Sequence, residues 1–73
     1  MNKENSILEI EQYIRDLGLM IGTKTATAIY EFVISKGSGN TILVNGRRTS
    51  DGMPEKIPVT KKQINDIINK YNQ

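Results

Sequence analysis

One stretch in the second half of the chain, residues 41–60, restricts the fold more than any other. It opens with residues 41–44 (TILV), a run of β-branched and apolar residues that favours a β-strand. The run stops at Asn45 and Gly46, the pair that best tolerates the positive φ angles of a two-residue type I′ turn. The pattern predicts an antiparallel hairpin whose return arm begins with residues 47–50 (RRTS).

A second turn signal follows at Asp51 and Gly52. Beyond it, Ile57 and Val59 predict a further short strand. Pro58 lies between them and has no amide hydrogen, so this strand is expected at an edge of the sheet. The stretch as a whole is interpreted as a small, cationic β-ribbon held between helices.

Composition excludes several kinds of chemistry. The 73 residues contain no Cys and no His, so the chain lacks disulfides, thiolate metal sites and the usual general base near neutral pH. A chain of this length makes one domain, residues 1–73, with a core of modest size. We therefore predict a protein that is not an enzyme and that uses neither a metal nor a cofactor.

The N-terminal residues lack the apolar core of a signal peptide. No run approaches the roughly 20 apolar residues of a membrane span. Because secreted mini-proteins usually depend on disulfides, a cytoplasmic location without membrane contact is expected.

Charge is distributed unevenly along the chain. Residues 1–35 carry three cations and five acids, whereas residues 36–73 carry seven cations and three acids. The basic half includes the ribbon. Such a patch is the electrostatic footprint expected for nucleic acid or an acidic partner, and the competing interpretation is an ordinary solubilising surface.

Helical periodicity marks a first helix near the N-terminus. Ser6 and Glu9 have the spacing of a capping box, which predicts that the helix begins at Ile7 and that residues 1–5 are frayed. Gly18 is the predicted residue that follows the helix. The apolar stripe of this helix contains Ile7, Ile10, Ile14 and Leu17.

Residues 19–22 (LMIG) form a short apolar connector, which is expected to lie across the core. A second helix, capped by Thr23 or Thr25, is predicted to extend to about Lys36 and stop at Gly37. Its predicted inward face contains Ala26, Ile29, Val33 and Phe32.

A third helix follows the ribbon. Thr60 and Gln63 form a second capping box in front of it. Its apolar residues recur at helical spacing and predict a helix that closes the core: Ile64, Ile67, Ile68 and Tyr71. The glycine-rich residues 37–40 follow a helix and precede a strand, an order that argues against a phosphate-binding loop.

The predicted order of elements is helix, connector, helix, ribbon, helix. It indicates an α+β fold, a small winged-helix-like domain with three helices and a two- or three-stranded antiparallel β-hairpin. In such folds the second helix enters the major groove of DNA and the wing lies against the backbone or minor groove. The residues predicted to contact DNA are Lys24, Thr25, Thr27, Arg47, Arg48, Lys56, Lys61 and Lys62.

From residue 22 to residue 71 the chain resembles the small winged-helix excisionases, the recombination directionality factors of phages and conjugative elements. The resemblance is carried by TATAIYEFVISKG, TILVNGRRT and IPVTKKQINDIINKY. It implies a non-enzymatic protein of a mobile element that binds duplex DNA, often as several copies. The chain departs from the family in its long acidic first helix, in Glu31 on the proposed recognition helix and in the insert SDGMPEK.

A second hypothesis is a small phage-type protein that binds and inhibits or modulates a host protein without contacting DNA. Its contact surface would be Leu19, Met20 and Ile21, or the acidic face of the first helix. Self-association into a structural domain is a third. Affinity for DNA falls steeply with salt, whereas an apolar protein interface responds weakly, so salt dependence separates the first two hypotheses.

Overall fold

The described part of the chain, residues 2–35 and 39–71 of a computed structural model, alternates helices with strands. A single sheet has the order β1-β2-β3, and both neighbouring pairs are antiparallel. The predicted α+β fold with three helices and an antiparallel sheet is therefore confirmed. The elements are α1 (Asn2–Asp16), β1 (Leu19–Met20), α2 (Thr23–Ser35), β2 (Thr41–Arg48), β3 (Pro54–Thr60) and α3 (Lys61–Tyr71).

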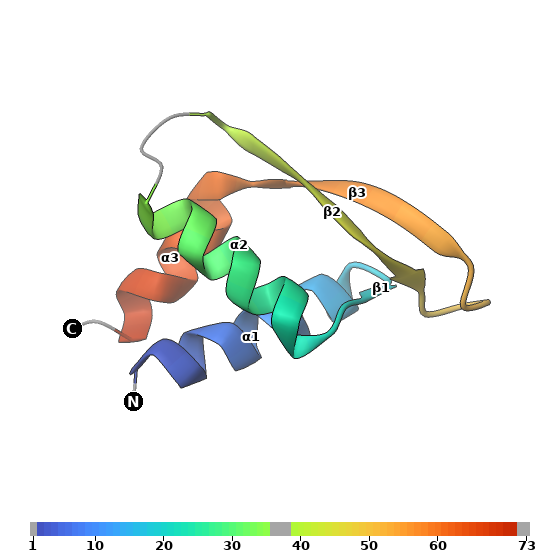
Figure 1. The fold of residues 1–73 in the computed structure, drawn as a ribbon, viewed down its shortest axis with the longest axis horizontal. Coiled ribbons are helices and arrows are strands. Elements are labelled where there is room, and N and C mark those ends of the chain that lie inside the picture. Colours follow the sequence, from blue (N-terminus) through green and yellow to red (C-terminus); the bar gives the residue numbers. More distant parts are fainter. Residues whose placement is uncertain (1, 36–38, 72–73) are drawn as a thin grey trace.

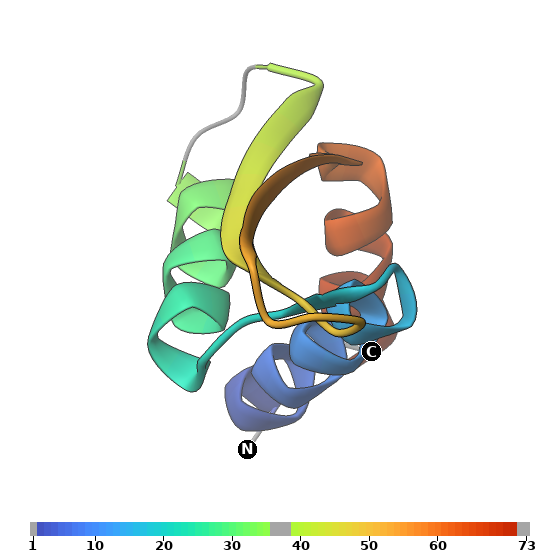
Figure 2. The same cartoon turned by 90° about the vertical axis from the view of Figure 1, so that its right-hand side faces the viewer.

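The elements form layers around one core (Figure 1). The β2–β3 ribbon lies on one side of α2 and α3, and α1 lies on the other. Seen along the long axis, α2 lies on the β2 side of the sheet and α3 on the β3 side (Figure 2). The buried core consists of Ile7, Ile10, Ile14, Leu19, Ala26, Ile29, Tyr30, Val33, Val44, Val59, Ile64 and Ile68.

Helix α1 begins earlier than the capping-box prediction placed it. Residues 2–5 are helical, so the expectation that residues 1–5 are frayed is wrong for those four, and Met1 lies outside the described residues. Ser6 is inside the helix and only 1% exposed, and its hydroxyl has no hydrogen-bond partner. Glu9, its supposed capping partner, instead binds Lys70 and Tyr71 of α3.

The extra helical turn contacts α2. The ammonium group of Lys3 lies 3.5 Å from a carboxylate oxygen of Glu31 and 5.9 Å from the ring centre of Tyr30, both on α2. At the other end, α1 stops at Asp16, which leaves Leu17 half exposed rather than in the predicted apolar stripe. Gly18 follows with a φ of 98°, as predicted.

The hairpin turn is not at Asn45 and Gly46, so that prediction is wrong. Strand β2 continues through both residues to Arg48, and Asn45 pairs with Lys56 of β3. The chain reverses direction over residues 49–53, where Gly52 has a φ of 75°. The second turn signal, at Asp51 and Gly52, is therefore the one that the fold uses.

Gly46 is needed for close packing rather than for a turn. A Cβ atom at this position would clash with the carbonyl oxygen of Met20 and would lie 2.9 Å from Cγ of Leu19. The predicted connector supplies these residues as strand β1, which pairs with the end of β2. Leu19 is fully buried, as expected of a connector across the core, whereas Met20 is exposed. Glycine is thus required because β1 lies directly against β2.

Helix α2 begins at Thr23, and its first backbone hydrogen bond runs from the Ala26 amide to the Gly22 carbonyl. Gly22 therefore takes the N-cap position, Thr25 lies within the helix, and the predicted threonine cap is wrong. Phe32 was predicted on the inward face, but it is 42% exposed, so that prediction is wrong. Tyr30 is buried in the core instead. The predicted end, at Lys36 and Gly37, lies outside the described residues.

The prediction for the third helix is confirmed. The Gln63 amide donates to the Thr60 hydroxyl at 3.3 Å, which is the first half of the capping box. The Gln63 side chain accepts instead from the Tyr13 hydroxyl of α1. Ile64 and Ile68 are buried, and Ile67 and Tyr71 are half-buried.

Replacing Ser6 distinguishes a buried helical residue from a helix cap. Because the Ser6 hydroxyl is buried without a partner, Ser6→Ala should leave the free energy of unfolding unchanged or raise it by up to about 1 kcal/mol. A cap would instead lose about 0.5–2 kcal/mol on the same change. Urea denaturation measures the difference, and a loss in the second range would contradict the assignment of Ser6 to the helix interior.

A second substitution tests the contact between β1 and β2. Gly46→Ala should lower the free energy of unfolding by about 1–3 kcal/mol, because the new methyl group meets backbone of β1. Asn45→Ala is the matched control, since Asn45 is exposed in the same strand and already carries a Cβ. Equal losses for the two variants in thermal or urea denaturation would favour a turn at these residues over a continuous strand.

Candidate functional site

Side chains alternate between the two faces of the β2–β3 ribbon. Ile42, Val44, Ile57 and Val59 face the helices and are buried or half-buried. The register places Leu43 opposite Pro58, Asn45 opposite Lys56 and Arg47 opposite Pro54, all on the other side of the ribbon. We call this side the outer face, and its exposed residues are Met20, Thr41, Leu43, Asn45, Arg47, Pro54, Lys56, Pro58 and Thr60.

The outer face combines positive charge with apolar surface. Arg47 and Lys56 are its cations, and none of its residues is acidic. Leu43 is 64% exposed and Met20 is 39% exposed, which is high for large apolar side chains. The helices cover the opposite face of the ribbon, so the outer face is the solvent-exposed side of a supported sheet.

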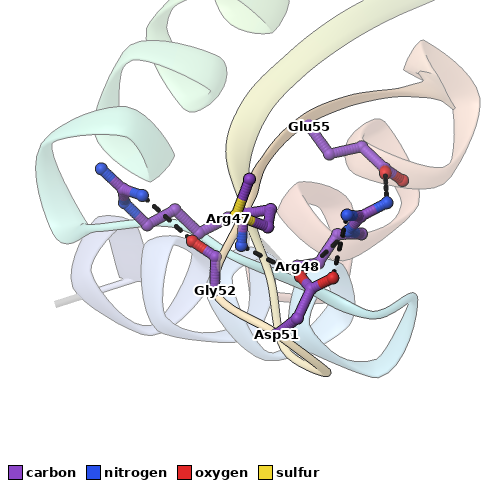
Figure 3. Close-up of polar contacts among 6 residues, drawn as sticks. Arg47, Arg48, Asp51, Gly52 and Glu55 are labelled. Carbon is purple, nitrogen blue, oxygen red and sulfur yellow. Dashed lines mark hydrogen bonds and ion pairs between the residues drawn. The ribbon is translucent and has the colours of Figure 1, made fainter.

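The charge of Arg47 is not neutralised within the described part of the chain. One guanidinium nitrogen, Nη1, donates to the Gly52 carbonyl at 3.0 Å (Figure 3). A carbonyl oxygen holds the side chain in place but carries no net charge. Among the described residues, neither Arg47 nor Lys56 forms an ion pair with an acid.

Arg48 points to the other side of the strand, and its charge is shared by two carboxylates (Figure 3). Its Nε and Nη2 atoms bind the two oxygens of Asp51 at 3.0 and 2.9 Å, and its Nη1 atom binds Glu55 at 3.2 Å. The hydrogen bond to Asp51, with the charges of Asp51 and Glu55, raises the pKa of the Arg48 guanidinium. The pair of arginines that the sequence presents as one cationic unit is thus split, and only Arg47 offers free positive charge.

Asp51 also holds the hairpin turn in shape. Its Oδ1 atom accepts from the Met53 amide at 3.0 Å while binding Arg48. The Met53 amide, followed by Arg48, lowers the pKa of the Asp51 carboxyl below its usual value of 3.8. Two backbone hydrogen bonds of 2.8 Å, from the Arg48 amide to the Met53 carbonyl and from the Gly52 amide to the Arg48 carbonyl, close the turn.

The other residues predicted to bind DNA do not gather on the outer face. Lys24, Thr25 and Thr27 are in the first turns of α2, and the Thr27 hydroxyl donates to the Thr23 carbonyl at 2.8 Å. Lys61 and Lys62 begin α3 at the end of the ribbon opposite the turn. Lys62 forms an ion pair with Asp66 at 3.1 Å.

The alternative contact residues are also separated. Leu19 is buried and Ile21 is half-buried, so of that segment only Met20 reaches the outer face. On the acidic face of α1, Glu9 binds Lys70 through both carboxylate oxygens, at 2.9 and 2.8 Å. This contact with Lys70, and the hydroxyl of Tyr71, lower the pKa of Glu9. These groups therefore join α1 to α3.

Sequence reasoning missed Leu43, Pro54 and Pro58 as members of the exposed surface. The alternation of side chains along residues 41–48 could have identified them, but the turn predicted at Asn45 and Gly46 interrupted that alternation. Reading the strand through to Arg48 places Leu43, Asn45 and Arg47 on one side.

No group of His, Cys, Asp or Glu side chains suited to a metal ion exists within residues 2–35 and 39–71. Within those same ranges, no helix has the length and apolar character needed to cross a membrane.

Comparison with known proteins yields a likeness in fold only. No family model and no curated protein matches the sequence. Two crystal structures of MreB5 of Spiroplasma citri, bound to ADP and to AMPPNP, match with TM-scores of 0.81 and 0.80 and with 20% and 22% sequence identity. Each match covers 94% of this chain and 22% of the MreB5 chain. The arrangement of helices and strands thus also occurs as one part of a longer protein.

Acid titration tests the Arg48–Asp51 contact. Because the Met53 amide and then Arg48 lower the pKa of Asp51 in the folded chain, these contacts of the ionised carboxylate stabilise the fold above about pH 4, and the stabilisation is lost as the pH falls through the lowered value. Asp51→Asn keeps an acceptor for the Met53 amide but removes the charge. The difference in unfolding free energy between wild type and this variant should therefore narrow as the pH falls from about 5 to below the lowered pKa of Asp51. A difference that stays constant over this range in urea denaturation would show that the charge of Asp51 contributes nothing to stability.

Proposed function

We propose that the chain is a non-enzymatic protein-binding module that uses the outer face of its sheet. The observation that carries the proposal is the combination of two unpaired cations and exposed apolar side chains on a face without acids. The matching partner is a protein segment with carboxylates and apolar side chains. Arg47 and Lys56 would bind the carboxylates, and Leu43 and Met20 would contact the apolar groups.

The two kinds of contact have different effects on binding. Burial of apolar area contributes about 25 cal/mol for each Å² removed from water, so exposed side chains such as Leu43 supply affinity. Exposed charges mainly steer the encounter and select against basic partners. The Arg47–Gly52 hydrogen bond supports the proposal because it holds one cation on the sheet before the partner arrives.

Duplex DNA is a second candidate, favoured by the absence of acids from the outer face and by Lys24 at the exposed start of α2. Sequence-independent affinity for DNA depends on how many phosphates a protein neutralises. Arg48 and Lys62 are bound to carboxylates of the chain, which reduces the positive charge that these two residues offer to phosphates. This distribution supports the protein partner over DNA.

The likeness to MreB5 agrees with a module but does not identify a ligand. ADP and AMPPNP are bound by MreB5, and this chain spans 22% of that protein. A shared fold does not imply a shared function. We therefore propose no nucleotide site for this chain.

Capture from a cell lysate, with and without nuclease treatment, tests the proposal. The immobilised wild-type chain should retain a protein partner after nuclease treatment. The double variant Arg47→Ala/Lys56→Ala should retain at least tenfold less of it, because both outer-face cations are gone. Its thermal stability should remain within about 0.5 kcal/mol of wild type, since exposed charges contribute little to folding.

The matched control is Arg15→Ala/Lys62→Ala, which removes the same net charge from α1 and α3. This variant should bind like wild type, and equal losses for the two double variants would indicate nonspecific attraction to charge. Capture that disappears with nuclease would favour DNA. Affinity for duplex DNA should then fall with salt at a slope of about −0.9 for each phosphate contacted.

A further inference from the structure

The two long edges of the sheet differ in their ability to accept another strand. The Arg48 amide donates to the Met53 carbonyl, so backbone hydrogen bonds join the two chain segments at this pair. Counting back along the register from this pair shows which residues of β3 direct their backbone groups at β2. Odd-numbered residues of β3 direct their backbone groups at β2, and even-numbered residues direct theirs at the free edge. Those even-numbered residues are Pro54, Lys56, Pro58 and Thr60.

This free edge of β3 is protected. Two of its four outward positions are prolines, which have no amide hydrogen to donate, and a third is a lysine. Prolines and lysines are the residues that natural sheets place on edges to prevent pairing with other chains. A strand added beside β3 would find few donors.

The edge of β2 lacks such protection. Strand β1 pairs only with Arg47 and Arg48, so no strand of the described residues covers β2 from Thr41 to Asn45 on that side. The same register directs the backbone N–H and C=O groups of Thr41, Leu43 and Asn45 toward this open edge. The open segment, residues 41–45 (TILVN), contains no charge, no proline and no glycine.

We propose that a second copy of this chain pairs with the open edge of β2, antiparallel and about a two-fold axis at Leu43. In this register Leu43 lies opposite Leu43 and Thr41 lies opposite Asn45 on the outer face. On the inner face Ile42 lies opposite Val44. Each pair therefore joins apolar to apolar or neutral polar to neutral polar, which is the kind of cross-strand pairing that stabilises a sheet.

Charge is also compatible with this register. Arg47 is already paired with Met20 of β1 on this edge, so it lies outside the joint and no cation faces a cation across it. The segment is thus self-complementary in the antiparallel, two-fold arrangement.

Helix α2 adds apolar surface beside the proposed joint. It lies on the β2 side of the sheet (Figure 2), and Thr27 on its flank lines the gap against α1. Phe32 follows Thr27 by five residues, which rotates the side-chain direction about the helix axis by about 140°. Phe32 therefore lies on the flank of α2 opposite Thr27. With 42% of its surface exposed, Phe32 is available to a second copy.

The assembly closes at two copies. The outer edge of β3 is protected and β1 is only two residues long, so pairing through residues 41–45 uses the one long unprotected edge segment among the described strands. An isologous contact of this kind ends with a dimer, whereas two open edges would allow a fibre. The dimer would carry both outer faces on one side of a continuous sheet, and the inference does not rest on the proposed partner.

Analytical ultracentrifugation of the purified chain tests this inference without any partner. The wild type should sediment as a concentration-dependent dimer between about 1 and 500 µM, a range that covers dissociation energies of about 5–8 kcal/mol. Leu43→Lys should raise the dimer dissociation constant at least tenfold, because two ammonium groups would meet at the axis. Leu8→Lys is the matched control, since Leu8 is 60% exposed on α1 and lies away from the sheet; it should dimerise like wild type.

A second variant keeps the result decisive. Leu43→Pro removes the central amide donor of the open edge but no donor to β3, so far-ultraviolet circular dichroism should remain that of the folded chain while dimerisation is lost. A monomeric wild type at 500 µM would overturn the proposal, as would dimerisation unaffected by both Leu43 variants or weakened equally by Leu8→Lys. Assemblies larger than a dimer would also overturn it.

Discussion

The close contact between β1 and β2 at Gly46 is the constraint on which the rest of the sheet depends. Only a residue without a Cβ lets the Met20 carbonyl approach β2 so closely. This contact keeps residues 45 and 46 inside the strand and moves the reversal of the chain to residues 49–53. The alternation of side chains then continues to Arg48, which determines the face on which each arginine lies.

That alternation controls the electrostatics of the surface. Arg47 and Arg48 are adjacent in sequence, yet one is on the outer face and the other is among carboxylates. The net charge of +2 therefore conveys little about the surface that a partner meets. Ion pairs such as Lys70–Glu9 and Lys62–Asp66 occupy further cations, while Arg47 and Lys56 remain unpaired on a face without acids.

The sheet is also asymmetric at its edges. Prolines in β3 make one edge a poor template for another strand, whereas the start of β2 has open backbone groups and uncharged side chains. A small domain whose exposed edges were both open would risk aggregation. The proposed dimer gives a role to this difference, because it covers the open edge and leaves the outer face accessible.

Local sequence signals determined the elements, and tertiary contacts decided how their side chains are used. The isoleucine spacing of α3, the Thr60 cap and the β-branched run at residues 41–44 are short-range signals, so their helices and strands could be predicted. The Ser6 box and the Asn45-Gly46 pair are equally good local signals, but packing of α1 on α2 and of β1 on β2 overrode them. Of the candidate site, Arg47 and Lys56 were found from the sequence as cations. The sequence alone could not show that Arg47 and Lys56 lie on the same face as Leu43 and that Arg48 lies on the other face. The register of the sheet decides this, because moving a turn by one residue exchanges the two faces of a strand.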